Sequence, residues 1–421
     1  MKILLVGNGG REHAIAWKLL KDDPSVELFC APGNAGTAAI ARNLQIDASD
    51  IPALLAWARE NAPDFTVVGP EAPLCAGLVD AFEAAGFPTF GPVRAAARME
   101  GSKAFAKEIM AAAQVPTAEA VVVRDEAAAR EAVARLGVPV VLKADGLAAG
   151  KGVMVCMDAA QVEAALCDLF SENKFGAAAS EVLVEQYLDG EEASILAFVD
   201  GKTVVPLASA QDHKRLLDGD KGPNTGGMGA YSPAPAVTPD MLAVVQSQIL
   251  RPVVEELSRR GIVYKGVLYA GLMLTKSGPK VLEFNCRFGD PETQAILPRL
   301  ASPLLPALRA CRDGALDASL VSWDPRPAVC VVMVSGGYPG KYQKGVVVEG
   351  LDEAAAQPDA VVFHAGTARR GGLVVTDGGR VFGVTALGAD VRSAVAAAYR
   401  TVVKIKFDGA SYRSDIAWRA L

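Results

Sequence analysis

Short apolar runs alternate with amphipathic stretches along the N-terminal part of the chain. The first such unit, MKILLVGNGGREHAIAWKLL, begins as a buried strand, passes through a glycine turn and continues with helical spacing. Further short strands are indicated by VELFCAP, DFTVVGPE and FPTFGP, with helical stretches such as IPALLAWAREN between them. Because strands that alternate with helices favour a parallel sheet, we expect an open, Rossmann-like α/β domain over residues 1–98.

The pattern changes after a boundary that we place near residues 94–101, where a helix begins at SKAFAKEIMAAAQ. A hairpin turning at Asp200 and Gly201 is predicted by ASILAFVDGKTVVPLASAQ. A long loop is predicted by LLDGDKGPNTGGMGAYSPAPAV, which is rich in Gly, Pro, Asn and Asp. Two more strands are indicated by GVLYAGLMLT and PKVLEFN. We therefore expect a central α+β domain over residues 99–323.

The last part of the chain, residues 324–421, is predicted to be a small mixed domain that is mostly β. Its strands are indicated by VCVVMVSGGYPG and GGLVVTDGGRVFGVTALG, and a helix by DVRSAVAAAYRTVVKI. A chain of 421 residues is too long for one ordinary hydrophobic core, which agrees with three domains.

Composition narrows the expected partners to small molecules. The net charge of -6 provides no general attraction to nucleic acid or acidic membranes, and neither is an expected partner. Seven cysteines without any CxxC spacing favour reduced thiols over a disulfide framework or structural zinc. The first apolar run is too short for a signal peptide, and none approaches the roughly 18 residues of a membrane span. We expect a cytoplasmic protein with no obligate protein partner.

The segment KADGLAAGKGV, residues 143–153, resembles a phosphate-binding loop without matching a P-loop. A P-loop has four residues between its first glycine and GK, whereas Gly146 and Gly150 enclose only three. Glycines after an apolar strand still allow the backbone to approach phosphates. Lys143 ends that strand and Lys103 opens a helix, so both are candidate phosphate ligands; ordinary surface salt bridges are the alternative.

The most informative run is KVLEFNCRFGDPE, residues 280–292. On a strand, Glu283 and Asn285 share a face, and their oxygens suit Mg2+. Arg287 beside them offers a planar fork for a carboxylate or phosphate. The alternative is a solvated acidic turn after an edge strand.

Three other motifs add weaker signals. In VLVEQYLDGEE a strand end could hold adenine and an acidic residue the ribose, although any strand leading into a turn can look like this. SAQDHKR places Asp212 and His213 at a strand end. NGGREH opens a helix, whose N-terminus suits an anion, but GxGxxG is missing and nicotinamide binding is not expected. No Ser-His-Asp arrangement or metal-type histidine pair supports covalent catalysis.

Taken together, the motifs resemble the phosphoribosylamine–glycine ligase family, the glycinamide ribonucleotide synthetases of the ATP-grasp superfamily. They occur in the family's order along essentially the whole chain: VGNGGREHA, APGNAGT, VGPEAPL, KADGLAAGKGV, AQDHKR, GPNTGGMGAYSPAP, LEFNCRFGDPET, GGYPG, FHAGT and YRSDIAW. The resemblance implies that the first domain is a pre-ATP-grasp domain. It also implies that the central domain is an ATP-grasp domain, with a mobile lid over about residues 122–188.

The resemblance implies the ligation of glycine to 5-phosphoribosylamine through glycyl phosphate, with ATP cleaved to ADP and phosphate in purine biosynthesis. ATP and Mg2+ are the implied cofactors, and Mn2+ can substitute. An upstream purine enzyme is an implied transient contact. The alternatives are another ATP-grasp carboxylate–amine ligase and a non-catalytic nucleotide-binding module. The latter would be expected to have lost Lys143, Glu283 or Asn285, which are all present.

The resemblance also implies roles for individual residues. Phosphate binding falls to Lys103, Lys143, Gly146, Gly150, Lys151 and Gly152. The adenosine is bordered by Glu185, Leu188 and Glu192, and Mg2+ is bound by Glu283 and Asn285. Phosphoribosylamine is assigned to Gly9, Gly10, Arg11, Pro70 and Glu71. Glycine and the amine are enclosed by Asp212, His213, Arg287 and Asp290. The residues expected to act in catalysis are Lys143, Asp212, Arg287 and Asp290. Many ATP-grasp enzymes carry a second acidic ligand on the preceding strand, where LYAGLML has only Ala270 and Gly271.

Overall fold

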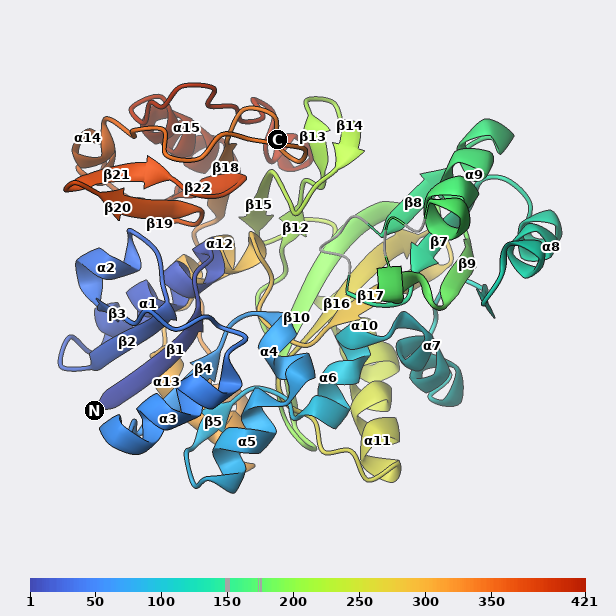
Figure 1. Cartoon of the computed structure of the whole chain (residues 1–421), viewed down its shortest axis with the longest axis horizontal. Coiled ribbons are helices and arrows are strands. Elements are labelled where there is room, and N and C mark those ends of the chain that lie inside the picture. Colours follow the sequence, from blue (N-terminus) through green and yellow to red (C-terminus); the bar gives the residue numbers. More distant parts are fainter. Residues whose placement is uncertain (148–151, 173, 175) are drawn as a thin grey trace.

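Figure 1 shows the computed structural model of the chain, in which residues 1–147, 152–172, 174 and 176–421 are described. The N-terminal part forms a five-stranded parallel sheet with strand order β3-β2-β1-β4-β5. Its strands are β1 (Lys2–Gly7), β2 (Glu27–Pro32), β3 (Arg42–Asn43), β4 (Phe65–Val68) and β5 (Thr89–Phe90). Its helices are α1 (Gly10–Asp22), α2 (Thr37–Ile40), α3 (Ile51–Asn61), α4 (Glu71–Ala76) and α5 (Leu78–Ala84). The predicted open parallel sheet is confirmed.

The first strand shows why this region folds as a sheet covered on both faces. Residues 3–6 are fully buried, and their side chains alternate between two cores. Leu4 and Val6 pack with Leu54 of α3, whereas Ile3 and Leu5 pack with Ile15 of α1. An uninterrupted apolar run is the signature of such a strand, because neither face meets water.

The segment that we expected to act as a lid, and that we refer to as the lid, forms a separate antiparallel sheet with strand order β6-β9-β7-β8 and its own hydrophobic core. The chain reaches it through α6 (Arg94–Gly101) and α7 (Lys103–Ala112). Its strands are β6 (Ala120–Val123), β7 (Val140–Ala144), β8 (Val153–Cys156) and β9 (Val182–Gln186), and its helices include α8 (Glu126–Leu136) and α9 (Ala159–Leu166). Figure 1 shows the lid projecting to the side, away from the N-terminal sheet.

The central sheet is antiparallel with strand order β11-β10-β16-β17. Its strands are β10 (Glu191–Asp200), β11 (Val204–Pro206), β16 (Lys265–Thr275) and β17 (Gly278–Asn285). Helices α10 (Pro239–Val245) and α11 (Arg251–Arg259) separate its two halves in the chain. The hairpin predicted at Asp200 and Gly201 joins β10 to β11 and is confirmed.

The segment that we expected to be a long loop contains three strands, so that prediction was wrong. An antiparallel ribbon is formed by β13 (Arg215–Leu217) and β14 (Lys221–Asn224), and β15 (Gly229–Ser232) follows it. The ribbon turns at Gly219 and Asp220, which both have positive φ. The turn-forming residues therefore belong to a tight hairpin. Tyr231 of β15 is buried in the hydrophobic core of the C-terminal sheet, which the Gly- and Pro-rich sequence around it does not indicate.

The C-terminal part is mostly β, as predicted, and its sheet recruits strands from the centre of the chain. The strand order is β12-β15-β18-β22-β19, with β12 (Gln211–Asp212), β18 (Ala328–Val334), β19 (Ala360–His364) and β22 (Arg380–Leu387). A second ribbon is formed by β20 (Thr367–Arg370) and β21 (Leu373–Thr376). The helices between and after these sheets are α12 (Glu292–Ile296), α13 (Leu304–Asp313), α14 (Leu351–Ala355) and α15 (Val391–Val402). Within the described ranges, no helix is long and apolar enough to cross a membrane.

Candidate active site

A cavity of about 550 Å³ lies where the lid, the central sheet and the N-terminal domain meet. It brings together residues that the sequence analysis drew from distant motifs. These are Arg11, Glu71, Lys103, Lys143, Gly152, Glu185, Leu188, Glu192, Asp212, Glu283, Asn285, Arg287 and Asp290. Gly150 and Lys151 lie outside the described residues.

One end of the cavity is apolar. Val141 and Val155 of the lid face it from one side, and Met273 and Leu282 of the central sheet also line it. Leu188, in the connection between the lid and the central sheet, completes this wall. Such a slot suits a flat, mostly apolar group, and polar atoms at its rim can fix the orientation of that group.

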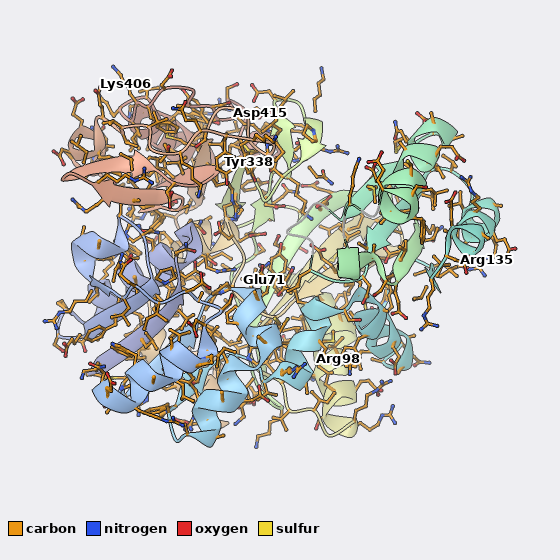
Figure 2. The ribbon with its side chains drawn as sticks, in the orientation of Figure 1. Glu71, Arg98, Arg135, Tyr338, Lys406 and Asp415 are labelled. Atoms are coloured by element: carbon orange, nitrogen blue, oxygen red, sulfur yellow. The ribbon has the colours of Figure 1, made fainter. Side chains whose placement is uncertain are left out.

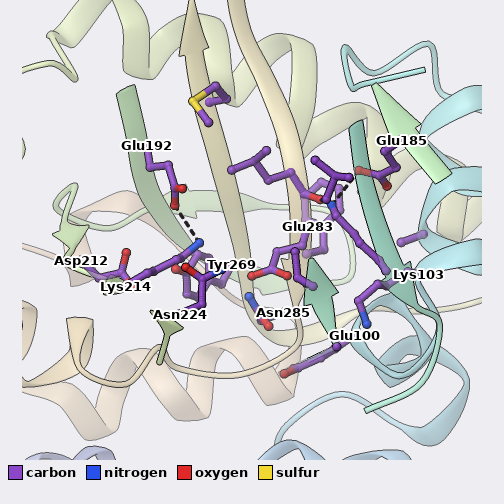
Figure 3. A pocket seen from close by; sticks show the side chains of 18 of the residues that line it. Glu100, Lys103, Glu185, Glu192, Asp212, Lys214, Asn224, Tyr269, Glu283 and Asn285 are labelled. Atoms are coloured by element: carbon purple, nitrogen blue, oxygen red, sulfur yellow. Dashed lines mark hydrogen bonds and ion pairs between the residues drawn. The ribbon is translucent and has the colours of Figure 1, made fainter. Parts of the chain in front are cut away.

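The buried carboxylate of Glu185 borders this slot (Figure 3), and two lysines pair with it. Glu185 Oε2 lies 2.7 Å from Lys143 Nζ, and its Oε1 lies 3.3 Å from Lys107 Nζ. Lys143 also donates to the Leu282 carbonyl at 3.0 Å. Lys107 was not predicted, although its position four residues after Lys103 on α7 places it on the same helix face.

Lys103 joins the start of the glycine-rich segment to the first turn of α7. Its Nζ donates to the carbonyl oxygens of Asp145 and Gly146, both at 3.2 Å. The Asp145 carboxylate accepts from the Ala104 amide at 2.6 Å and from Ser102 Oγ at 3.2 Å. Burial lowers the pKa of Lys103, and the nearby charge of Glu283 opposes this shift.

Glu283 and Asn285 both line the cavity from β17, as their spacing predicts. A register shift between Gly271 and Leu272 of β16 leaves Leu282 as the extra residue opposite them. This bulge lets Leu282 line the cavity together with Glu283, its neighbour in the chain. Among the described residues, the Glu283 carboxylate makes no hydrogen bond or ion pair.

Four cations set the charge state of Glu283. Burial raises its pKa, but the positive charges around it outweigh that effect and hold the pKa below the ordinary value. These charges belong to Lys214, Lys143, Lys103 and Arg287. A carboxylate that is ionised without a direct partner is well suited to a hard metal ion.

A second acidic group lies on the opposite wall. Lys214 Nζ pairs with Glu192 Oε2 at 2.8 Å (Figure 3). Asp212 lies near this pair, and its carboxyl group makes no hydrogen bond or ion pair with the described residues. Burial raises the pKa of Asp212 to about 8; Lys214 opposes the shift, and Glu292 adds to it. Glu292 accepts hydrogen bonds from Tyr269 Oη at 2.5 Å and Ser194 Oγ at 3.0 Å.

Arg287 is held between two carboxylates. Its Nε donates to Glu71 Oε2 at 3.2 Å, and an NH2 hydrogen bond of 2.9 Å reaches Glu100 Oε1. Burial lowers the pKa of Arg287, but Glu100 and Glu71 raise it above the ordinary value. The guanidinium fork that we expected to receive a substrate anion is thus engaged largely by protein carboxylates. Figure 2 shows Glu71 near the middle of the molecule, where the domains meet.

Asp290 connects all three domains. Its Oδ1 accepts from Gln294 Nε2 at 2.8 Å and lies 3.3 Å from NH2 of Arg380 in the C-terminal sheet. Its Oδ2 accepts from the Arg11 amide at 3.4 Å. Attraction by Arg380 and Arg11 outweighs the effect of burial and lowers the pKa of Asp290.

Most of the chain matches the domains of one family, in sequence order. Its models cover residues 1–100 (Phosphoribosylglycinamide synthetase, N domain), residues 101–293 (the ATP-grasp (A) domain) and residues 328–419 (the C domain). The chain belongs to the phosphoribosylglycinamide synthetase family. The resemblance seen in the motifs is thereby confirmed, as is the ATP-grasp fold.

Named relatives support the assignment to the phosphoribosylglycinamide synthetase family. The phosphoribosylamine–glycine ligase of Pseudomonas aeruginosa is 52% identical over 427 residues, covering 100% of this chain and 98% of the relative. That of Vibrio vulnificus strain YJ016 is 50% identical, with 100% and 99% coverage.

Solved structures agree with the fold. The crystal structure of phosphoribosylamine–glycine ligase from Thermotoga maritima matches with a TM-score of 0.83 at 33% identity, covering 99% of this chain and 100% of that one. The biotin carboxylase domain of 2-oxoglutarate carboxylase from Hydrogenobacter thermophilus matches with a TM-score of 0.75 at 15% identity, covering 97% and 91%. The latter similarity concerns the fold alone.

Five predicted site residues of this synthetase-family chain do not line the cavity: Gly9, Gly10, Pro70, Gly146 and His213. His213 is 1% exposed and accepts a hydrogen bond from the Ala417 amide through Nε2 at 2.9 Å. Burial lowers its pKa. Its ring therefore ties the residue after β12 to the C-terminal segment, which favours a structural role over substrate binding.

The cavity also contains residues that the motifs did not single out as ligands. The charged ones are Glu100, Lys107, Lys214, Arg215, Glu292 and Arg380. Lys214 and Glu292 lie within motifs that we discussed. Their closeness in the sequence to Asp212 and Asp290 could have indicated that they also line the cavity. For Arg380, in a glycine-rich β segment, the sequence contained no such signal.

Proposed function

We propose that the chain catalyses the ATP-dependent joining of glycine to 5-phosphoribosylamine, giving glycinamide ribonucleotide, ADP and phosphate in purine biosynthesis. This is the activity for which its relatives are named. The observation that carries the proposal is the open Glu283 carboxylate, with Asn285 beside it and four cations around it. The glycine carboxylate, the phosphate of phosphoribosylamine and the polyphosphate of ATP need such a concentration of positive charge and metal ligands.

ATP would lie with its base in the apolar slot and its phosphates toward β17. Val141 and Leu188 would border the base, with Glu185 at its edge. Lys103 and Lys143 would contact the phosphates, because both amino groups lie on the cavity wall and both act on Glu283 electrostatically. Gly146 and Gly152 flank the part of the loop that would cover the phosphates.

The residues present fit a magnesium ion. Glu283 and Asn285 offer a carboxylate and an amide oxygen, and Mg2+ commonly takes its remaining ligands from water and phosphate. When bound, the ion would neutralise charge that develops on the phosphates. Mn2+ has similar ligand preferences and would substitute.

The reaction would proceed in two displacements. A glycine carboxylate oxygen attacks the γ-phosphorus of ATP, the bond to the bridging oxygen breaks, and ADP leaves. The amine of phosphoribosylamine then attacks the acyl carbon of glycyl phosphate, and phosphate leaves. The nitrogen loses one proton in this step, and Asp212, with a pKa of about 8, is our candidate to accept it.

The two remaining substrates would divide between the outer walls. Phosphoribosylamine would contact Arg11 and Glu71, with the Gly9, Gly10 and Pro70 turns behind them. Glycine would lie between Asp212 and Asp290, near the Arg287 guanidinium that Glu71 and Glu100 hold in place. These positions would bring both nucleophiles close to the β17 site.

We propose that the enzyme works in the cytoplasm without an obligate protein partner, with at most transient contact to the enzyme that supplies phosphoribosylamine. All seven cysteines are free, and five of them are deeply buried, namely Cys30, Cys156, Cys286, Cys311 and Cys330, which fits a reducing compartment. The net charge of -6 agrees with small-molecule substrates.

An oxygen-transfer experiment tests this function. With glycine labelled by 18O in its carboxylate, one labelled oxygen should appear in the phosphate product for each turnover, because the attacking oxygen stays with phosphorus. ADP should form only when glycine is present. ADP formation at the same rate with and without glycine, or a phosphate product without 18O, would contradict the proposal.

A further inference from the structure

The N-terminal sheet has a crevice between the carboxyl ends of β1 and β4. From β1 the chain crosses through α1 to β2 on one side, and β4 leads to β5 on the other side. Figure 1 shows α1 beside β1. In open α/β sheets, a strand pair at which the connections diverge in this way usually receives the ligand.

In this chain the crevice is filled by the side chain of Glu12, which is 1% exposed. A Cβ on Gly69, just after β4, would lie 2.1 Å from Glu12 Oε1. A Cβ on Gly7, at the end of β1, would lie 2.6 Å from Glu12 Cγ. Both distances are far below van der Waals contact, so these positions need glycine because the glutamate passes between them.

The carboxylate is engaged on both oxygens. Oε2 accepts from the Gly9 amide at 2.6 Å, at the residue that caps α1. Oε1 accepts from Arg11 Nε at 2.5 Å. The Gly9 amide, which the sequence suggested for a substrate anion, is therefore used by the protein itself.

The ion pair fixes where Arg11 presents its charge. While Nε binds Glu12, NH1 donates to the Phe288 carbonyl at 3.1 Å, so the guanidinium is held from two directions. Arg11 still lines the cavity, and its NH2 has no hydrogen bond among the described residues. The NH2 group of the fixed Arg11 guanidinium can therefore donate to an anion in the cavity.

We propose that Glu12 is a positioning residue that closes the crevice between β1 and β4 and holds Arg11 for the phosphate of phosphoribosylamine. The buried carboxylate excludes that phosphate from the usual position at the strand ends. The anion then meets Arg11 on the cavity side, toward Asp290 and the catalytic strand β17. This inference rests on the proposed function.

Kinetics of Glu12→Gln test the inference. The amide keeps the size and can still accept from the Gly9 N–H, but it loses the ion pair with Arg11. We expect the KM for phosphoribosylamine to rise about tenfold, while the KM values for ATP and glycine stay within about twofold, as removal of one charged contact predicts. The matched control is Glu83→Gln, because Glu83 also binds a backbone amide, that of Thr89, and an arginine, Arg312. Glu83 does not line the cavity, so all three KM values should remain unchanged.

A double-mutant cycle separates positioning from general destabilisation. If Glu12 acts through Arg11, Glu12→Gln should add little to the KM effect of Arg11→Ala. Additive effects, or equal changes in all three KM values, would overturn the proposal. If Glu12→Gln does not melt cooperatively, Gly69→Ala replaces it in the test, because its Cβ would displace the Glu12 carboxylate. The proposal then predicts the same pattern of KM values for Gly69→Ala. Wild-type protein that makes no product from the three substrates would instead refute the proposed function.

Discussion

Two carboxylates in the cavity wall respond oppositely to burial because their neighbours differ. Glu283 is surrounded by cations, which lower its pKa despite the loss of solvent. Asp212 has Lys214 on one side but carboxylates on the other, and burial dominates its raised pKa. The wall thus offers one group that stays ionised for a metal and another that can exchange a proton near neutral pH.

The variant Glu283→Gln should lose phosphoryl transfer while keeping its fold. The amide preserves size but removes the charge that offsets magnesium beside the polyphosphate. We expect kcat to fall by roughly a hundredfold or more, about 3 kcal/mol of transition-state stabilisation. The melting temperature should change little, because Glu283 has no hydrogen bond or ion pair among the described residues. Glu181→Gln, in an ion pair with Arg124 outside the cavity, is the control. Normal turnover by a well-folded Glu283→Gln variant would contradict the assignment of Glu283 on β17 to the catalytic site.

Asp212→Asn should stabilise the protein in a pH-dependent way. In the unfolded chain Asp212 ionises near its ordinary pKa of 3.8, whereas in the folded protein it ionises at about 8. The folded protein therefore favours the protonated carboxyl group of Asp212. The stability associated with this preference is complete below pH 3.8 and is lost as the pH rises through about 8. The melting temperature of Asp212→Asn relative to wild type should rise over this range and then level off. Thermal melts in a pH series measure it, and a constant difference would argue against the raised pKa.

At the scale of elements, the lid has its own hydrophobic core and is joined to the body by polar contacts from α7 and β17. Its core contains Leu142, Val162 and Val184 from three of its elements. Lys143 reaches the Leu282 carbonyl of β17, and Lys103 reaches Gly146 from α7. ATP would lie between these two contacts, so its binding should couple the lid to the central sheet.

Hydrogen exchange should detect that coupling. We expect the amides of Asp145, Leu147 and Gly152 to exchange more slowly when ATP and magnesium bind, because the lid must exclude water from an acyl phosphate. Amides of the central sheet, such as that of Leu196, should not change. Unchanged exchange in the lid at saturating nucleotide would speak against a moving lid over residues 122–188.

At the scale of the whole molecule, the N- and C-terminal domains meet at a pair of neutral histidines. His13 Nδ1 accepts from the His364 amide at 2.8 Å, and Asn34 donates to the His364 carbonyl at 2.8 Å. Burial lowers the pKa of His13 to about 3, with a contribution from His364, and burial lowers that of His364 to about 4. Protonation of either ring must therefore weaken the contact between the domains.

This interface should make the protein acid-sensitive. Both histidines have depressed pKa values, so their stabilisation is present above the ordinary value of 6.5 and is lost as the pH falls toward about 4 and about 3. The double variant His13→Asn/His364→Asn should show a flatter dependence of melting temperature on pH in this window. At pH 8 both proteins carry neutral side chains here, so that pH gives the reference difference. An equally steep curve in the variant would place the acid sensitivity elsewhere.

The sequence by itself determined the elements whose signals are local. The apolar run at residues 3–6 predicts a doubly covered strand because both of its faces need burial. The spacing of Glu283 and Asn285 places them on one side of a strand because side chains alternate. The ordered motifs identified the family.

Only the tertiary structure decided which distant groups complete each other. Tyr231 lies in a segment rich in turn residues, yet β15 pairs with β18 in the C-terminal sheet. Arg380 reaches Asp290 across 90 residues of chain, and Glu185 finds its lysines on different elements. Backbone pairing and charge compensation depend on which surfaces the folded chain brings together, and local patterns contain no information about partners so far away in the sequence.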